Sequence, residues 1–397
     1  MRGKRIVYFI GAGLSKSLEK PGKRIPLMHD FVQVMAEYSD SDNTILTPLA
    51  ELENNGKAFQ HECDDCARLA RSVVQTDRSC ATKLAFKRAF MSRQPESIEQ
   101  LLANALAKEP GAEAPSGTAL VIRFNYAINR FFSLLGWEVH GDPLERFLHH
   151  QFRLYPPPSN QHTFVSFNYD LILDRAIQKT AEESWNPFTG YGFSVRRYWE
   201  RGKDRVEGLP AQLEPPPSDR IRILKPHGSL NWLVPQAKTG QTGDIGYLLE
   251  DGPVCVPLTQ QGEITYSDIV EPTAVFPTIL AVCIIPPTEP AKRVGFGFIE
   301  KTRCLERLAI ESADEVYVLG WSMPETDKDQ HRLIRYAVGE RRKPLESVTV
   351  INQCEEPKYY DRVAKTFGIT HSALRKFDNG FSDFVQQRTN NRRTEAS

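Results

Sequence analysis

Short apolar, β-branched runs alternate with amphipathic stretches at both ends of the 397-residue chain. Five runs have the length and composition of buried β-strands: residues 5–10, 163–167, 221–224, 315–319 and 347–351. Apolar residues recur at helical spacing in residues 171–179, 299–312 and 329–339. Strands that alternate with helices predict an α/β fold, a Rossmann-like doubly wound parallel sheet with a helical insertion or subdomain.

The middle of the chain has a different pattern. Residues 39–155 are rich in Ala, Leu, Glu, Lys, Arg and Gln at spacings near the helical period, and strand signals are scarce there. A run of prolines at residues 156–158 then marks a boundary. The sequence therefore predicts a discontinuous sheet domain, residues 1–38 and 156–385, that is interrupted by a helical insertion over residues 39–155.

Three further stretches carry no regular period. Residues 185–214 are rich in Gly, Pro and aromatic residues, which favours an ordered loop. Residues 235–267 are predicted to be loop-like with short β possibilities. The polar residues 386–397 are expected to form a flexible tail.

Composition places the chain among soluble globular proteins, with 40% hydrophobic and 25% charged residues. Its 50 basic and 50 acidic residues cancel, so the balance predicts neither direct nucleic-acid binding nor attraction to an anionic membrane. The apolar run behind the basic N-terminus breaks at Gly11, and residues 275–285 are too few to span a bilayer, so no signal peptide or membrane segment is expected. Seven cysteines, an odd number, lack the pattern of a disulfide framework, which favours a cytoplasmic location.

Candidate chemistry gathers in three polar motifs, each at the end of a predicted strand. They are residues 11–15 (GAGLS), 167–170 (FNYD) and 227–229 (HGS). Ligands of open α/β sheets bind at the carboxyl ends of the strands, so we expect the three motifs to share one crevice. A phosphate cradle, an Asn/Asp pair and a histidine base suit the cleavage of a nucleotide cofactor better than its storage.

The first motif, Gly11-Ala12-Gly13, permits a tight turn in which the backbone approaches a diphosphate. The helix behind it would offer free N–H groups and a positive dipole end, and Ser15 can cap that helix. Lys16 stands where the Rossmann fingerprint has its third glycine. On its own, such a turn is as often structural as ligand-binding.

The other two motifs each allow a structural and a functional interpretation. Asn168 and Asp170 can form an Asx turn, with Asp170 as the N-cap of the following helix. Alternatively, Asn168 serves the ribose and an attacking water while Asp170 binds a nicotinamide amide. His227 can be a buried structural histidine or the general base of the site, and Gly228 leaves room for a ligand beside it.

Together with further motifs, these residues resemble a sirtuin-like NAD-cleaving domain of the type found in bacterial anti-phage effectors. The further motifs are residues 25–28 (IPLM), 225–232 (KPHGSLNW), 319–324 (LGWSMP) with Asp327, and 350–352 (VIN). The resemblance implies a catalytic set of Asn168, His227 and Asp170. It implies a cofactor-binding set of Gly11, Ala12, Gly13, Ser15, Pro26, Gly228, Gly320, Ser322 and Asn352.

NAD is expected as the substrate, and no metal is expected. Deacylating sirtuins carry a zinc module of two Cys-x-x-Cys pairs after the catalytic histidine. The sole such pair in this chain, Cys63 and Cys66, lies far upstream of His227. Without that module a groove for acyl-lysine peptides is not expected, and water becomes the acceptor of the ADP-ribosyl group.

These expectations combine into an NAD⁺ hydrolase that releases nicotinamide and ADP-ribose and serves in anti-phage abortive infection. Uncontrolled loss of NAD would harm the host, so the resemblance implies gating by homo-oligomer assembly, by an activating protein such as a HerA-like ATPase, or by both. Two alternatives stay open: a module that senses NAD or ADP-ribose without cleaving it, and an ADP-ribosyltransferase or deacylase. The trigger, the oligomeric state and the linear or cyclic form of the product also stay open.

Overall fold

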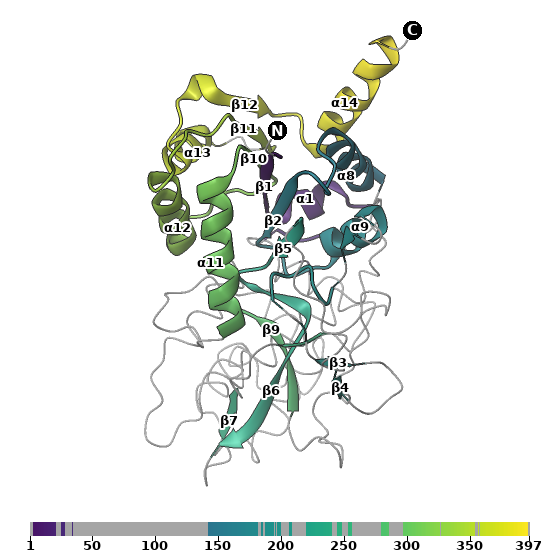
Figure 1. The fold of residues 1–397 in the computed structure, drawn as a ribbon, viewed down its shortest axis with the longest axis vertical. Helices are drawn as coiled ribbons and strands as arrows, with labels where there is room; N and C mark the ends of the chain where they lie inside the picture. Colours follow the sequence, from purple (N-terminus) through teal and green to yellow (C-terminus); the bar gives the residue numbers. More distant parts are fainter. Residues whose placement is uncertain are drawn as a thin grey trace, which may run out of the picture.

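The computed structural model shows two sheets and the helices around one of them (Figure 1). The described residues are 3–20, 25–27, 34, 142–181, 184–185, 187–193, 195, 197–199, 206–208, 220–239, 244–247, 253–255, 279–285, 297–325, 327–353, 356 and 358–395. Most of the predicted helical insertion, residues 39–141, lies outside them, as do Met28, Cys63 and Cys66.

Six parallel strands form the first sheet, in the order β12-β11-β10-β1-β2-β5. The strands are β1 (Arg5–Ile10), β2 (Gln161–Ser166), β5 (Ile221–Leu224), β10 (Glu315–Leu319), β11 (Ser347–Ile351) and β12 (Leu374–Phe377). The chain runs outward from β1 through β2 to β5, returns to β10 beside β1, and then runs outward through β11 to β12. This is the strand order of a Rossmann-like doubly wound sheet, and it confirms the predicted fold class.

Helices cover both faces of this sheet (Figure 1). One face carries α11 (Gly297–Ser312), α12 (Lys328–Gly339) and α13 (Tyr359–Phe367), and the other carries α1 (Ala12–Ser17), α8 (Asp142–Leu154), α9 (Ile172–Ala181) and the start of α14 (Phe381–Glu395). A 3₁₀ turn, His371–Ala373, precedes β12. Because both faces are covered, β10 and β11 are buried at every position, which explains why each strand is apolar or β-branched after its first residue.

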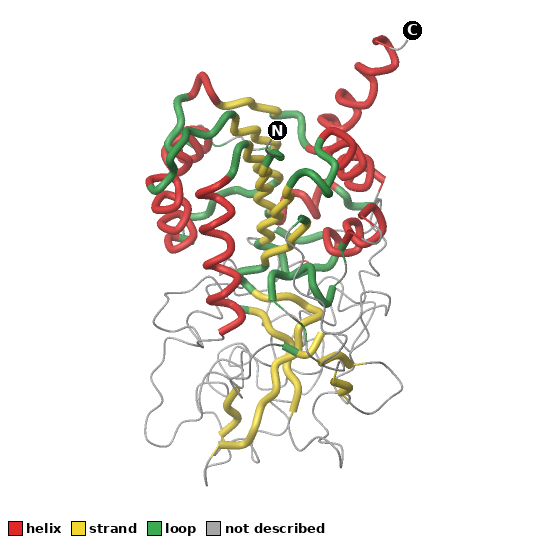
Figure 2. Tube along the Cα trace, viewed as in Figure 1, coloured by secondary structure: helices red, strands yellow, loops and turns green. Residues whose placement is uncertain are grey.

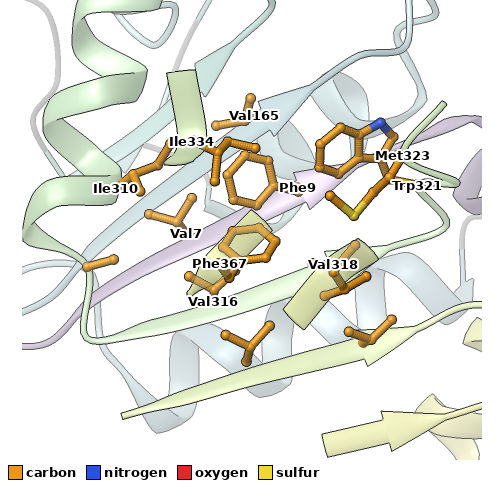
Figure 3. Close-up of a cluster of buried hydrophobic side chains, with 14 of the residues drawn as sticks. Val7, Phe9, Val165, Ile310, Val316, Val318, Trp321, Met323, Ile334 and Phe367 are labelled. Atoms are coloured by element: carbon orange, nitrogen blue, oxygen red, sulfur yellow. The ribbon is translucent and has the colours of Figure 1, made fainter. Parts of the chain in front are cut away.

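A hydrophobic core cluster lies between the sheet and the layer of α11, α12 and α13 (Figure 3). Phe9 of β1 packs edge-on against Phe367 of α13, with ring centroids 5.3 Å apart, and Ile334 of α12 belongs to the same cluster. Burial of one such side chain contributes about 1.5–3 kcal/mol. Trp321, just after β10, stacks on Phe9 with centroids 5.6 Å apart, so the core extends to the loops at the carboxyl ends of the strands.

The second sheet is mainly antiparallel and lies beyond the carboxyl end of β5 (Figure 2). Its strands are β3 (Arg197–Trp199), β4 (Val206–Gly208), β6 (Gly228–Thr239), β7 (Asp244–Tyr247), β8 (Val254–Cys255) and β9 (Ile279–Ile284). The sequence predicts a loop over residues 185–214, where β3 and β4 form, and short β possibilities over residues 235–267, where β7 and β8 form. It predicts no element for residues 228–234, where the long strand β6 begins. Its main partner β9 is distant along the chain, so local patterns carry little sign of the pairing.

The division into domains stays a prediction, but two helices near its limits pack or extend differently from the sequence expectation. The helical pattern places residues 142–154 in the insertion, but α8 packs on α9 and α14, and its Phe147 contacts Tyr8 of β1. The polar pattern predicts a flexible tail from residue 386, but α14 continues to Glu395. The difference at α8 arises because periodicity identifies a helix without showing the layer in which it packs. The difference at α14 arises because residues 386–395 contain no Pro or Gly that would end the helix.

Candidate active site

A cavity of about 710 Å³ lies at the carboxyl ends of the parallel strands. Loops that follow all six strands line it: residues 11–17 and 25–27 after β1, 167–170 after β2, 227 after β5, 320–322, 324 and 327 after β10, 352–353 after β11, and 380–381 after β12. The strand order reverses between β1 and β10, and Rossmann-like sheets bind dinucleotides at this point. The volume is also within the usual range of ligand pockets.

Every predicted site residue except Gly228 lines this cavity: Gly11, Ala12, Gly13, Ser15, Pro26, Asn168, Asp170, His227, Gly320, Ser322 and Asn352. Gly228 has a φ of +86°, and a Cβ there would come within 2.0 Å of the carbonyl oxygen of Cys283. Cys283 belongs to β9, so the pairing of β6 with β9 requires this glycine. The pairing with β9 is therefore sufficient reason for this glycine, and a role of Gly228 in making room for a ligand stays a prediction.

The glycines of the first motif pack against the loop that follows β10. A Cβ on Gly11 would lie 2.5 Å from the Cα of Trp321, and a Cβ on Gly13 would lie 2.8 Å from the loop's first carbonyl oxygen. The Gly11 amide donates to the carbonyl oxygen of Leu319, and the Gly13 amide donates to that of Gly320. Neither Gly11 nor Gly13 has a positive φ, so close approach of two backbone segments explains them rather than a tight turn. Both amides therefore have partners within the chain. The sequence predicts free N–H groups at the start of the helix, but the Gly13 amide, in the first turn of α1, is not one of them.

Asn168, Ser15 and Asp170 form a buried chain of hydrogen bonds. The Asn168 side-chain amide donates to the Ser15 hydroxyl oxygen (2.9 Å), and that hydroxyl donates to Asp170 Oδ2 (2.8 Å). The Asn168 amide also donates to the carbonyl oxygen of Gly11 (3.1 Å). The chain thus ties the second motif to the first. Ser15 lies inside α1, and Gly11 is the N-cap residue, so the prediction that Ser15 caps this helix is wrong.

Asp170 caps the start of α9, which is one of the two roles that the sequence allows. Its Oδ1 accepts a hydrogen bond from the backbone amide of Ile172 at the start of α9 (3.1 Å). Burial raises the pKa of Asp170, and the nearby Lys225 opposes that rise. Both carboxylate oxygens already have partners within the chain, and contact between Asp170 and a nicotinamide amide stays a prediction.

His227 lies in the turn between β5 and β6, with its ring beside Phe167 at a centroid distance of 5.6 Å. Its Nε2 lies 3.7 Å from Oδ1 of Asp327, and both side chains are buried. Neither atom has a hydrogen-bond partner among the described residues. The sequence pattern includes Asp327 in a motif without assigning it a role, and only the fold brings it beside His227.

Lys225, which directly follows β5, is fully buried and joins the loops around the site. Its ammonium donates to the carbonyl oxygen of Asp170 (2.6 Å), to Asp174 Oδ2 (3.0 Å) and to the Ser229 hydroxyl (2.9 Å). The Tyr191 hydroxyl donates to the other oxygen of Asp174 (2.6 Å). Sequence reasoning missed the role of Lys225, although a lysine that ends an apolar strand was a possible signal.

Behind Asp327 lies a second buried carboxyl group, Glu306 of α11. It accepts a hydrogen bond from the side-chain amide of Gln330 on α12. Burial raises the pKa of Glu306 from 4.5 to about 8, and the negative charge of Asp327 adds to the rise. The folded protein therefore retains a proton on Glu306 at pH values where the unfolded chain has released it.

Replacement of Glu306 with Gln is expected to flatten the pH dependence of stability. The contribution of Glu306 is fully present below pH 4.5 and is lost as the pH rises toward about 8, because its pKa is raised in the folded state. The loss reaches at most about 1.4 kcal/mol of unfolding free energy per pH unit. Urea unfolding of wild type and E306Q between about pH 5 and pH 8 measures it. E300Q on the exposed side of α11 is the control, and equal pH slopes for E306Q and wild type would contradict the assignment.

Within the described part of the chain, no group of three or more His, Cys, Asp or Glu side chains could hold a metal ion. That the chain uses no metal stays a prediction. Every described helix is too short or too polar to cross a membrane.

No family model matches the sequence, and no curated protein matches it. Among solved structures, the chain is similar to a Sir2 protein in complex with the inhibitor EX-527, 2'-O-acetyl-ADP-ribose and a deacetylated p53 peptide. The two chains are 10% identical over 96% of this chain and 91% of the other, with a TM-score of 0.33.

Proposed function

We propose that the chain is an NAD⁺ hydrolase that cleaves the nicotinamide–ribose bond and yields nicotinamide and ADP-ribose. The observation that carries the proposal is that Asn168 and His227, from the loops after β2 and β5, line one cavity where the sheet reverses its strand order. A Rossmann-like sheet binds dinucleotides at that place, and a polar amide and an imidazole base are both present there. The resemblance of the sequence motifs to sirtuin-like NAD-cleaving domains supports the same substrate.

The proposed chemistry follows from what the bond requires. The bond breaks through an oxocarbenium-like state, so the site has to bring water to the anomeric carbon and hold the leaving group. Both amide hydrogens of Asn168 are donated to Gly11 and Ser15, which leaves its carbonyl oxygen to accept a hydrogen bond from water or a ribose hydroxyl. In this scheme His227 takes the proton and Asp170 contacts the departing carboxamide.

Incubation of the purified protein with NAD⁺ tests the proposal, with nicotinamide and ADP-ribose separated by chromatography. Wild type is expected to form both products in equal amounts, and the His227→Ala variant is expected to form neither. If calorimetry shows that wild type binds NAD⁺ while neither product accumulates with any candidate activator, the hydrolase is contradicted. A label from NAD⁺ that stays on protein would instead identify an ADP-ribosyltransferase.

A second candidate is a module that binds NAD or ADP-ribose without cleaving it. One observation favours it: the amide of Asn168 and both carboxylate oxygens of Asp170 are engaged within the chain, as in purely structural residues. Such a module would bind ADP-ribose equally well in wild type and in His227→Ala, and neither would release nicotinamide.

The proposed biological role is an anti-phage abortive-infection effector in the cytoplasm, and it rests on the motif resemblance. Because such an enzyme has to be restrained, its activity is proposed to depend on homo-oligomer assembly, on an activating protein such as a HerA-like ATPase, or on both. The assay above, repeated with a HerA-like ATPase and at several protein concentrations, is expected to show activation. Full and concentration-independent activity of the isolated chain would exclude both forms of gating.

A further inference from the structure

We propose that Asp327 positions His227 by forming a buried carboxylate–imidazole pair with it. The proposal deepens the NAD⁺ hydrolase assignment and rests on it. His227 Nε2 and Asp327 Oδ1 lie 3.7 Å apart, and the two side chains are only 4% and 3% exposed. Both residues line the cavity at the carboxyl ends of the strands, although they come from loops after different strands, β5 and β10.

The carboxylate of Asp327 does not cap the helix that it precedes. It is the N-cap residue of α12, where an aspartate usually accepts a hydrogen bond from the first turn of the helix. No side-chain capping bond forms at this helix, and Asp327 Oδ1 has no hydrogen-bond partner among the described residues. Burial of an unpartnered carboxylate oxygen is unfavourable, so Oδ1 near His227 calls for a compensating interaction, which a proton on Nε2 supplies.

Neighbouring titratable groups do not take the place of Asp327. Glu306 keeps a proton near neutrality because burial raises its pKa to about 8. Burial lowers the pKa of His331, which removes it as a competing cation beside Asp327. Asp170 has partners for both of its carboxylate oxygens. The carboxylate that faces Nε2 is therefore that of Asp327.

The pair selects one tautomer of the neutral imidazole. A proton on Nε2, held toward Asp327, leaves the lone pair on Nδ1, which then accepts the proton of a water molecule or ribose hydroxyl. The water oxygen bonds to the anomeric carbon, and nicotinamide leaves with the electron pair of the glycosidic bond. The carboxylate stabilises the resulting imidazolium. The distance of 3.7 Å exceeds that of a hydrogen bond, and such contacts in active sites often shorten when the substrate binds.

The test compares Asp327→Asn with Asp329→Asn. Asp329 lies in the first turn of the same helix, faces Arg332 at 3.9 Å and does not line the cavity, so its variant controls for loss of a carboxylate at this helix end. D327N is expected to reduce kcat by about 10²–10⁴-fold with little change in KM, as for other imidazole bases that lose their carboxylate. D329N is expected to keep the wild-type kcat.

A second readout does not depend on catalysis. Untagged protein with ¹⁵N-labelled histidine contains nine such residues, and the His227 signals are assigned by their loss in His227→Gln. Wild type and D329N are expected to show the Nε2-protonated tautomer, and D327N a mixture of tautomers. If wild type cleaves no NAD⁺ but the tautomer of His227 changes only in D327N, the proposed hydrolase function is contradicted and the pair of Asp327 and His227 is supported. The same tautomer in D327N and wild type, or an unchanged kcat in D327N, overturns the positioning role.

Discussion

Replacement of Asn168 with Ala is expected to reduce kcat for NAD⁺ cleavage by about 10²–10³-fold and to change KM far less. A group that orients the reacting water acts mainly in the transition state, and removal of one such polar contact typically has an effect of this size. Asn168 also holds the first motif through Gly11 and Ser15, so some loss of stability is expected as well. Steady-state kinetics and thermal unfolding of the same preparation separate the two effects.

Asn160 offers a matched control for this variant. It has the same exposure as Asn168, 9%, and it also makes two hydrogen bonds, accepting from the Lys4 amide (2.8 Å) and donating to the carbonyl oxygen of Pro156 (3.0 Å). It does not line the cavity. Asn160→Ala is therefore expected to lower stability with an unchanged kcat. Equal losses of kcat in both variants would show that Asn168 acts through the fold alone.

Five of the six strands of the parallel sheet and the gathering of the site were predictable because they follow from local patterns. The edge strand β12 was not predicted, because only Leu374 among its four residues is buried. Each of the five predicted strands is a short run buried on both faces, and such runs stand out in the sequence. The carboxyl ends of parallel strands share one edge of a sheet, so position after a strand is enough to bring Asn168, His227 and Asn352 to one cavity.

The reasons for the glycines of the site and the carboxylate beside His227 were not predictable, because they depend on contacts between segments that are distant along the chain. The need for glycine at position 228 is set by the carbonyl oxygen of Cys283 on β9, and that at position 11 by the backbone of Trp321. Asp327 lies beside His227 only because the loop before α12 faces the turn after β5. No local pattern of polar residues reports such neighbours, and for the same reason the long strand β6 and its partner β9 were not predicted.

The same dependence on distant contacts makes Lys225 the residue with the largest expected effect on stability. Its ammonium and the Asp174 carboxylate are both 0% exposed and 3.0 Å apart. Lys225→Met removes the ammonium charge and leaves the Asp174 carboxylate buried, with the Tyr191 hydroxyl as the hydrogen-bond donor to its second oxygen. Loss of one partner from a buried ion pair is expected to lower the free energy of unfolding by about 3–5 kcal/mol. That is a large share of the roughly 5–15 kcal/mol that stabilises a typical domain.

Urea unfolding of Lys225→Met, Asp174→Asn and the double variant tests whether the charge pair is the cause. The double variant carries no unpaired charge, so it is expected to be more stable than the sum of the two single effects predicts. Lys179→Met on α9 removes a lysine that is 68% exposed and pairs with Glu145, and it is expected to change stability little. Strict additivity of the two buried substitutions would mean that the ammonium acts through Asp170 and Ser229 rather than through Asp174. In that case Lys225 would serve mainly to hold the loops of Asn168 and His227 together, and kcat would fall in Lys225→Met but not in Asp174→Asn.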